Sequence, residues 1–214
     1  MATPTIDGRR ARGDASRRAV LAQATQLASI DGLDGVSIGA LATASGRSKS
    51  SIATLFGDKQ QLQLATIDAA ADIYRERVIE PARRSPRGLA RVTALLRAAL
   101  DYSEERVFAG GCFFAAVSAD LDSKTGPAAD AVRAWMRNWH GYLDHHLRLA
   151  VDAGELAPDT DPAQLGFEVL ALVEAANLRS LLTDDTLPYR RAAHAIRRTL
   201  LQAGAAPELL RALE

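Results

Sequence analysis

Residues 37–59 restrict the possible folds of this chain more tightly than any other stretch, because they predict two short helices joined by a tight turn. Ser37 is suited to cap the first helix. Gly46 follows Ala42 by four residues, where the first helix needs a left-handed residue to end. Ser48 is a candidate N-cap for the second helix. Since small residues let two helices cross at a steep angle, the stretch predicts a helix-turn-helix unit.

The second helix of this unit has one apolar side. Ile52, Leu55 and Phe56 stand at i, i+3 and i+4, which places them in a single stripe facing a core. The opposite side carries small or charged residues, namely Lys49, Ser50, Ala53 and Thr54. A short helix with such an outer face fits the major groove of DNA. The spacing also suits an ordinary helical hairpin inside an all-helical core, so spacing alone leaves both interpretations open.

Residues 46–62 resemble the recognition-helix signature of the TetR (tetracycline-repressor-like) family of transcriptional regulators. The positions that match are Gly46, Ser48, Lys49, Ile52, Phe56, Lys59 and Leu62. The stretch 17–45 is similar to the first two helices of that family, whereas the rest of the chain resembles it only in architecture. The resemblance implies a dimer that binds a palindromic operator, usually as a repressor, and is released by a small-molecule inducer.

The resemblance also implies which residues face DNA. They are Ser37, Arg47, Ser48, Lys49, Ser50, Ala53, Thr54 and Lys59. The sequence departs from the family at three of its positions: Ala53 replaces a usual aromatic, Leu55 a usual histidine or tyrosine, and Arg47 a usual apolar residue. These departures imply that arginines replace part of the phosphate contacts. They also leave open an alternative, a helical protein-interaction module that has lost specific DNA binding.

Charge is distributed unevenly along the chain. The net charge is zero overall, which argues against a uniformly basic nucleic-acid coat. Residues 1–59 carry eight Lys or Arg and five Asp or Glu, a net charge of +3, and the remainder carries −3. Because DNA attracts cations, this small asymmetry is consistent with a DNA-binding head on a regulatory body.

The sequence also predicts where the protein resides. It contains no apolar run long enough to span a membrane, and the arginines near the N-terminus precede no apolar segment of the kind found in signal peptides. Its one cysteine, Cys112, excludes an internal disulfide. We therefore expect a cytoplasmic protein. Cys112 is interpreted as a buried structural residue, with a thiol sensor as the alternative.

Three segments are expected from the order of signals. Residues 1–13, with three arginines and two glycines, predict a disordered arm that is either solvated or follows DNA. Residues 14–60 predict the three-helix DNA-binding domain, in which Asp14 caps a helix from 15 to about 31. Residues 61–214 predict a helical ligand-binding and dimerisation domain. With no convincing strand pattern, the fold class is all-α, with about nine helices.

Lys59 lies in the first turn of a helix that Asp58 is placed to cap. A cation at this position is disfavoured by the helix dipole, and a nearby phosphate would remove the conflict. This helix is predicted to run from 58 to about 80 and to link the two domains.

Later helices are expected at 87–105, 112–121, 127–153, 162–183 and 188–203. The helix at 162–183 is apolar on every side, with Leu165 and Val169 on one face and Phe167 and Leu181 on others. A helix of this kind must be covered all round, and a second subunit supplies the missing cover most simply. We therefore expect a homodimer through helices 162–183 and 188–203, packed as a four-helix bundle.

Aromatic residues indicate where a ligand could bind. An apolar cavity is expected from Tyr102, Cys112, Phe113, Phe114, Trp135, Trp139, Tyr142 and His146. Such a lining suits an apolar or aromatic inducer, and the resemblance implies an inducer pocket in this part of the chain. Ordinary core packing explains the same periodicity, so the two interpretations stay open.

No catalytic or metal-binding pattern stands out. His140, His145 and His146 are not spaced i, i+3 or i+4 as a helical metal pair requires, so solvated or hydrogen-bonded histidines are expected. The sequence contains no glycine-rich phosphate loop and no nucleophile elbow. We expect neither an enzyme nor a cofactor. The basic last helix, with Arg190, Arg191 and Arg197, is interpreted as a solvated face.

Overall fold

The computed structural model describes residues 6–214, with side chains from residue 11 onward. All regular structure in these residues is helical. The helices are α1 (Ile6–Gly35), α2 (Ile38–Ser45), α3 (Lys49–Phe56), α4 (Lys59–Tyr74), α5 (Glu80–Ala82), α6 (Leu89–Glu104), α7 (Phe113–Leu121), α8 (Pro127–Asp152), α9 (Pro162–Thr183) and α10 (Leu187–Gln202). A π-helical turn, η1 (Arg75–Ile79), joins α4 to α5, and a 3₁₀ helix, η2 (Pro207–Leu213), follows α10. The predicted all-α class is confirmed.

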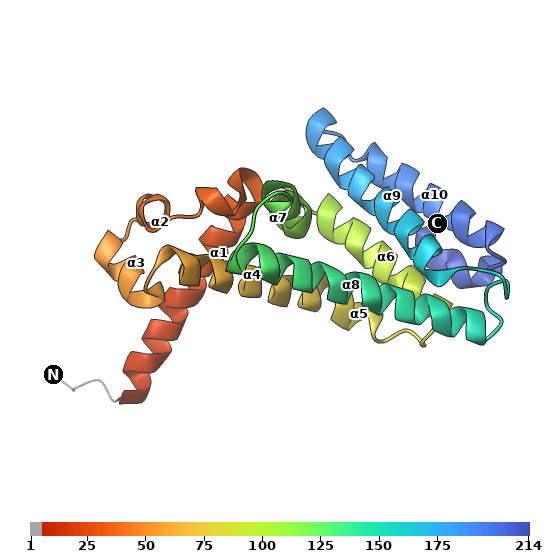
Figure 1. The fold of residues 1–214 in the computed structure, drawn as a ribbon, viewed down its shortest axis with the longest axis horizontal. Helices are drawn as coiled ribbons and strands as arrows, with labels where there is room; N and C mark the ends of the chain where they lie inside the picture. The colour runs from red at the N-terminus through yellow and green to blue at the C-terminus, as the bar shows by residue number, and fades with distance from the viewer. Residues whose placement is uncertain (1–5) are drawn as a thin grey trace.

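The molecule is elongated, with the N-terminal helices at one end and α9 and α10 at the other (Figure 1). Helices α4 and α8 run side by side along the length and connect the two ends (Figure 1). The first helices form a head: Leu41 of α2, Ile52 of α3 and Leu62 of α4 are all fully buried there. Helix α1 also packs against α7, so the head is attached to the body through two helices, α1 and α4.

The start of α1 differs from the sequence prediction. The helix begins at Ile6 rather than near residue 15, so Gly8 and Gly13 do not interrupt it. Neither glycine adopts positive φ, and a glycine inside a helix costs only about 1 kcal/mol relative to alanine. The predicted arm at 1–13 is therefore helical from Ile6, and its first five residues lie outside the described part. At its other end, α1 is interrupted at Gly32, where φ is 69°.

The long connecting helix includes a feature that periodicity did not predict. Its hydrogen-bond pattern widens to a π turn at η1 and continues through Pro81 to Ala82. The remaining helices lie within two residues of their predicted bounds, and α9 coincides with the predicted 162–183. The helix η2 was also not predicted; it packs on α6 with Leu210 and Leu213 buried.

Helix α9 has the uncovered apolar surface that its sequence suggested. Four of its large apolar side chains stay exposed to solvent: Phe167, Leu178, Leu181 and Leu182. Among the described helices, none is long and apolar enough to cross a membrane.

Candidate DNA-binding face and ligand cavity

Local hydrogen bonds fix the geometry of the α2–α3 unit. The Ser37 hydroxyl accepts a bond of 3.1 Å from the backbone N–H of Ala40. Gly46 ends α2 with a φ of 63°. The Ser48 hydroxyl accepts a bond of 3.1 Å from the N–H of Ser51 and so caps α3. The caps and the left-handed turn predicted from the sequence are thus confirmed.

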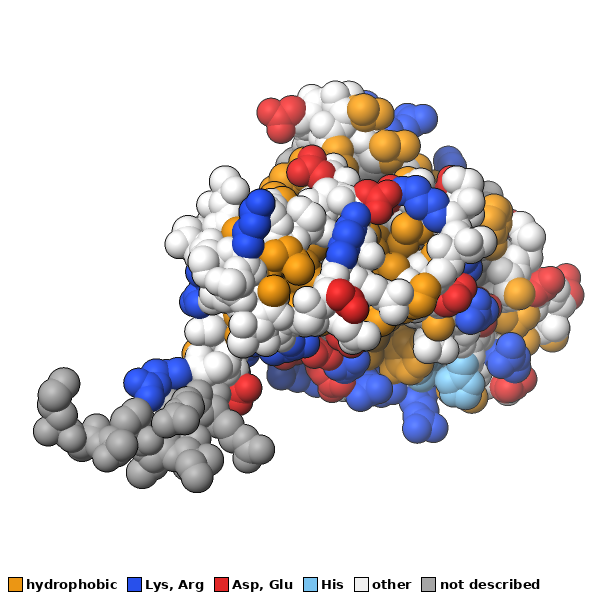
Figure 2. All heavy atoms as spheres, turned by 60° about the vertical axis from the view of Figure 1, so that its left-hand side comes forward, with side chains coloured by type: hydrophobic (Ala, Val, Ile, Leu, Met, Phe, Trp, Pro, Cys, Tyr) orange, Lys and Arg blue, Asp and Glu red, His pale blue; other side chains and the backbone are white. Residues whose placement is uncertain are grey.

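The outer face of α3 is open to solvent. Ile52 and Phe56 anchor the helix, with 0% and 6% of their surface exposed. Lys49, Ser50 and Thr54 are exposed on the opposite side. Figure 2 shows lysine and arginine side chains spread among uncharged ones on this end of the molecule. The side chains that the sequence assigned to a major groove therefore point outward together.

Hydroxyl groups on this face are already ordered. The Thr54 hydroxyl donates 2.8 Å to the carbonyl oxygen of Ser50. The Ser50 and Ser48 hydroxyls lie 3.0 Å apart and share a hydrogen bond. Since the proton of Thr54 is committed to the helix, its oxygen is left to accept a hydrogen bond from a base edge.

Two arginines hold α3 against α1. The Arg17 guanidinium donates a bond of 2.6 Å to the carbonyl oxygen of Leu55 and lies 4.5 Å from the centre of the Phe56 ring. Arg47 donates to the Ser16 hydroxyl at 3.5 Å and is half-buried. Arg17 was not among the predicted site residues, because its role depends on a contact across 38 positions of sequence.

Lys59 belongs to a chain of charges that joins the head to the body. Its ammonium group lies 3.6 Å from the Asp34 carboxylate and is half-exposed. The other oxygen of Asp34 accepts 2.8 Å from Lys124, which also donates 2.6 Å to Asp120 on α7. The bond from Lys124 lowers the pKa of Asp34. The Asp34 carboxylate of the same chain thus offsets part of the unfavourable interaction between Lys59 and the helix dipole. The sequence had suggested that a phosphate does this.

Tyr74, at the end of α4, is the centre of an aromatic cluster. Its ring lies 5.1 Å from Tyr102, 5.0 Å from Trp135 and 5.2 Å from Trp139, in edge-to-face contacts. Phe114 stacks on Trp135 at 3.4 Å. Five predicted cavity residues gather in this cluster: Tyr102, Phe113, Phe114, Trp135 and Trp139. Tyr74 itself was missed, although its spacing from Ala70 and Ile67 put it on the inner face of α4.

The rings leave little empty space between them. A cavity of about 50 Å³ remains, with Tyr74, Cys112, Phe114, Trp135 and Trp139 among its lining residues. About 150 Å³ is needed to hold benzene, so the aromatic cluster is mostly packed against itself. Tyr102 and Phe113 support the cluster without lining this cavity.

Tyr142 and His146 lie farther along α8, outside the cavity lining. Their rings contact each other at 4.8 Å. Burial and the nearby Arg91 lower the pKa of His146 to about 4, so this histidine is neutral near pH 7. The structure therefore divides the predicted ligand-binding residues between two places.

Cys112 stands at the cavity wall, next to the loop that connects α6 and α7. Its backbone N–H donates 3.0 Å to the Asn177 side chain of α9. Burial raises the pKa of its thiol. A protonated thiol is a poor nucleophile, which favours the structural interpretation of this cysteine over a thiol sensor. The described residues include no group of three or more His, Cys, Asp or Glu placed to hold a metal ion.

Comparison with known proteins extends these observations. Residues 88–196 match the family described as "Tetracyclin repressor-like, C-terminal domain". A comparison with curated protein sequences finds no match.

Solved structures share the fold over most of the chain. A TetR transcriptional regulator from Chloroflexus aurantiacus is 26% identical, with a TM-score of 0.81 over 89% of this chain and 96% of its own. A TetR-family regulator from Cytophaga hutchinsonii is 19% identical, with a TM-score of 0.76 over 90% and 96%. The regulator AibR, solved with isovaleryl coenzyme A and operator DNA, is 20% identical, with a TM-score of 0.63 over 75% and 85%.

The family match covers half of the chain. The residues that precede it include the helix-turn-helix of α2 and α3, with the outer face of α3 exposed to solvent. This chain belongs to the tetracycline-repressor-like (TetR) family of transcriptional regulators.

Proposed function

We propose that the protein is a ligand-responsive repressor that binds a palindromic operator as a homodimer and is released by a small-molecule inducer. The observation that carries this proposal is the outer face of α3, where Lys49, Ser50 and Thr54 are exposed above the buried Ile52 and Phe56. A helix presented in this way fits the major groove.

The proposed contacts with DNA follow from where each side chain stands. Lys49, Ser50 and Thr54 face base edges, and Ala53 offers its methyl group to a thymine methyl. The remaining contacts reach the phosphate backbone and come from Ser37, Arg47, Ser48 and Lys59. Lys59 is the most informative of these, because a phosphate would compete with Asp34 for its ammonium group.

Dimerisation through α9 and α10 is supported by an exposed apolar stripe. The stripe runs along α9 at helical spacing and consists of Phe167, Ala171, Ala175, Leu178 and Leu182. Phe167 is 70% exposed and Leu182 is 76% exposed. A second copy of the same two helices would cover this stripe as a four-helix bundle. Two-fold symmetry would then place the two α3 helices about 34–36 Å apart, one turn of DNA.

The loop between α6 and α7 connects the aromatic cavity to the head, and the effect of inducer binding is proposed to be transmitted through it. The Gln26 amide, on α1, donates 2.9 Å to the carbonyl oxygen of Val107 and accepts 2.9 Å from the N–H of Ala109. The Ser29 hydroxyl accepts 3.1 Å from the N–H of Gly110. The same loop ends at Cys112, in the wall of the aromatic cavity. If the loop has two arrangements, a ligand that binds one of them more tightly would favour it and so change the orientation of the head. The size of this change is set by the difference between the ligand's affinities for the two arrangements.

Selection from a random pool of DNA duplexes tests this function. The expected result is a palindrome with half-sites about 10 base pairs apart, bound with an affinity that falls steeply as salt increases. A protein that selects no sequence and binds DNA no better at low salt would contradict the proposal. That result would favour the alternative of a helical protein-interaction module.

A further inference from the structure

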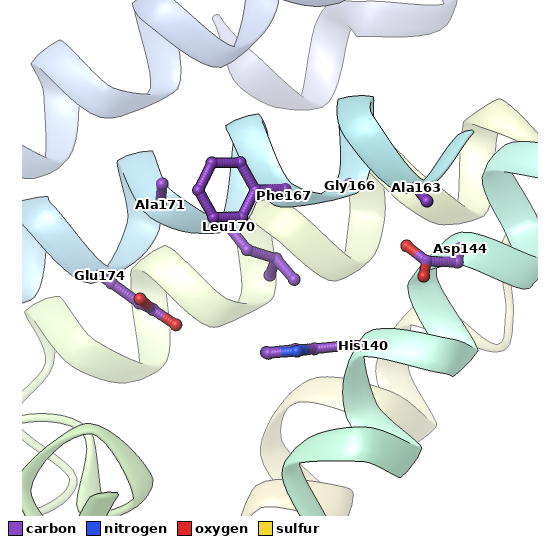
Figure 3. Close-up of a pocket in the computed structure, with 8 residues that line it drawn as sticks. All are labelled: His140, Asp144, Ala163, Gly166, Phe167, Leu170, Ala171 and Glu174. Atoms are coloured by element: carbon purple, nitrogen blue, oxygen red, sulfur yellow. The ribbon is translucent and has the colours of Figure 1, made fainter. Parts of the chain in front are cut away.

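A cleft between α8 and α9 lies beside the aromatic cavity. It has a volume of about 180 Å³. His140 and Asp144 reach it from α8, and Leu170 and Glu174 from α9 (Figure 3). Leu170 and Glu174 also line the aromatic cavity, so these two residues stand between the two spaces. Since about 150 Å³ holds benzene, the cleft has room for a small ring that the cavity alone lacks.

The charges of this cleft have one sign. Asp144 and Glu174 are its acidic residues, and neither Lys nor Arg lines it. Glu174 is exposed and forms no ion pair with any side chain that the structure describes. Asp144 lies against Gly166, where any side chain would overlap its carboxylate. The glycine therefore makes room for a charged group in the cleft.

His140 adds an unused polar atom. Its Nε2 is shielded from solvent and has no hydrogen-bond partner among the described residues. Figure 3 shows the imidazole reaching into the cleft from α8, below Leu170 and between Asp144 and Glu174. A buried polar atom without a partner costs free energy. In the tautomer that carries its proton on Nδ1, this nitrogen can accept a hydrogen bond from the N–H of a primary or secondary amine, a bond that a quaternary ammonium compound cannot form.

Beyond Leu170 and Glu174, the wall of the adjoining cavity is aromatic. Tyr74, Trp135 and Trp139 line it, and Glu174 is its one charged residue. Aromatic faces attract cations, by about 0.5–2 kcal/mol each. The carboxylate at the opening and the rings beyond it thus favour the same kind of molecule.

We propose that the ligand of this site is a cationic molecule with an apolar or aromatic body. Its ammonium group lies at Glu174, beside the aromatic cavity and within reach of His140 and Asp144, and its body lies in the cleft against Phe167 and Leu170. The proposal rests on the proposed function and narrows it from any small apolar inducer to amines and quaternary ammonium compounds. A carboxylate or phosphate ligand is disfavoured, because it would face the two acidic groups of the cleft, whose lining contains neither Lys nor Arg.

The site also lies close to the surface proposed for dimerisation. Phe167 and Ala171 belong to the cleft and to the exposed stripe of α9. A bound molecule would therefore lie beside the proposed two-fold interface. For this reason the binding experiment includes a measurement of the protein's mass in solution.

The chain's two tryptophans provide the measurement, since both line the aromatic cavity. Their fluorescence is followed while the full-length protein is titrated with benzyltrimethylammonium, with neopentylbenzene and with phenylacetate. The first two molecules have the same shape and differ in charge, and the third is an anion. We expect the cation to bind at least about tenfold more tightly than its neutral counterpart, equivalent to about 1.4 kcal/mol, and phenylacetate to bind more weakly still.

Two variants assign the effect to one carboxylate. Glu174→Gln removes the charge with little change in shape and is expected to abolish the preference for the cation. Glu168→Gln is the control, because Glu168 is exposed on the same helix, accepts a bond from Gln164 and lines neither space. Sedimentation is expected to give the same mass for both variants.

Three results would overturn the assignment of a cationic ligand. They are equal or tighter binding of neopentylbenzene or phenylacetate, an unchanged preference in Glu174→Gln, and no fluorescence change with any of the three molecules. The selection of DNA duplexes is scored separately. A protein that selects a palindrome but prefers the neutral molecule keeps the regulatory function and loses only the ligand class.

Discussion

The Asp120 carboxylate, on α7 of the body, accepts a hydrogen bond of 3.0 Å from the backbone N–H of Leu33 in the head. Its other oxygen accepts 2.6 Å from Lys124, which holds Asp34 as well. A side chain of the body thus binds the backbone where α1 is interrupted at Gly32. This contact ties the position of the DNA-binding head to α7, whose first residues pack in the aromatic cluster.

Replacing Asp120 with alanine is expected to destabilise the protein by about 1–3 kcal/mol, because the N–H of the buried Leu33 would lose its partner. Urea unfolding of the purified protein measures this change. Asp122→Ala is the control, since Asp122 is exposed nearby on the same segment and its carboxylate forms none of these bonds. Equal stability of the two variants would show that the contact does not hold the head.

Gly110 allows a close approach between the α6–α7 loop and α1. A side chain there would overlap the backbone carbonyl of Ser29. Gly110→Ala is therefore expected to cost about 1–3 kcal/mol through overpacking and to weaken operator binding. Gly141→Ala gives the matched comparison: Gly141 is exposed within α8 with open space around it, so alanine should stabilise the helix by up to about 1 kcal/mol. Thermal unfolding of both variants decides this point.

His146 makes stability depend on pH. Its folded pKa of about 4 lies below the unfolded value of 6.5, so the unfolded chain binds a proton that the folded one excludes. Its contribution is fully present above pH 6.5 and is lost as pH falls toward 4, by up to about 3 kcal/mol. Unfolding at several pH values should show a smaller loss in His146→Gln than in the wild type. His194→Gln, at an exposed histidine, should match the wild type.

The exposed stripe of α9 predicts how the proposed dimer can be broken. Leu178→Glu places a charge in the proposed interface and is expected to give a monomer by sedimentation. Ile30→Glu is the control, because Ile30 is similarly exposed, at 62% against 58%, but belongs to α1 rather than to the stripe on α9. A dimer that survives in Leu178→Glu and dissociates in Ile30→Glu would move the interface to the head.

Local signals explain what the sequence predicted well. The caps at Ser37 and Ser48 and the left-handed Gly46 each depend on a few neighbouring residues, and all three are present in the structure. The bounds of α9 follow from Asp161 and Pro162 at its start, which is also a local pattern. Amphipathic spacing was sufficient to place Ile52 and Phe56 inside the head.

Contacts between distant segments explain what the sequence missed. Tyr74 became the centre of the aromatic cluster only because α4, α6 and α8 meet there. Conversely, helical spacing grouped Trp135 with His146, but eleven residues of helix separate their positions by about 16 Å. One small cavity cannot reach both. Asp34 and Asp120 likewise gained their roles through partners more than 80 positions away.

The most direct test of the account measures how Thr54→Ala and Lys59→Ala bind the selected duplex and versions of it that carry single base changes. Lys59→Ala should weaken binding to every duplex about equally and lower the salt dependence, whereas Thr54→Ala should relax the preference at one base position by about 1–3 kcal/mol. Thr183→Ala should bind like the wild type, because Thr183 is an exposed threonine at the end of α9, outside the α2–α3 unit, with the same kind of bond, 2.9 Å to the carbonyl of Arg179. Unchanged affinity and base preference in both Thr54→Ala and Lys59→Ala would contradict the claim that α3 and the start of α4 meet DNA.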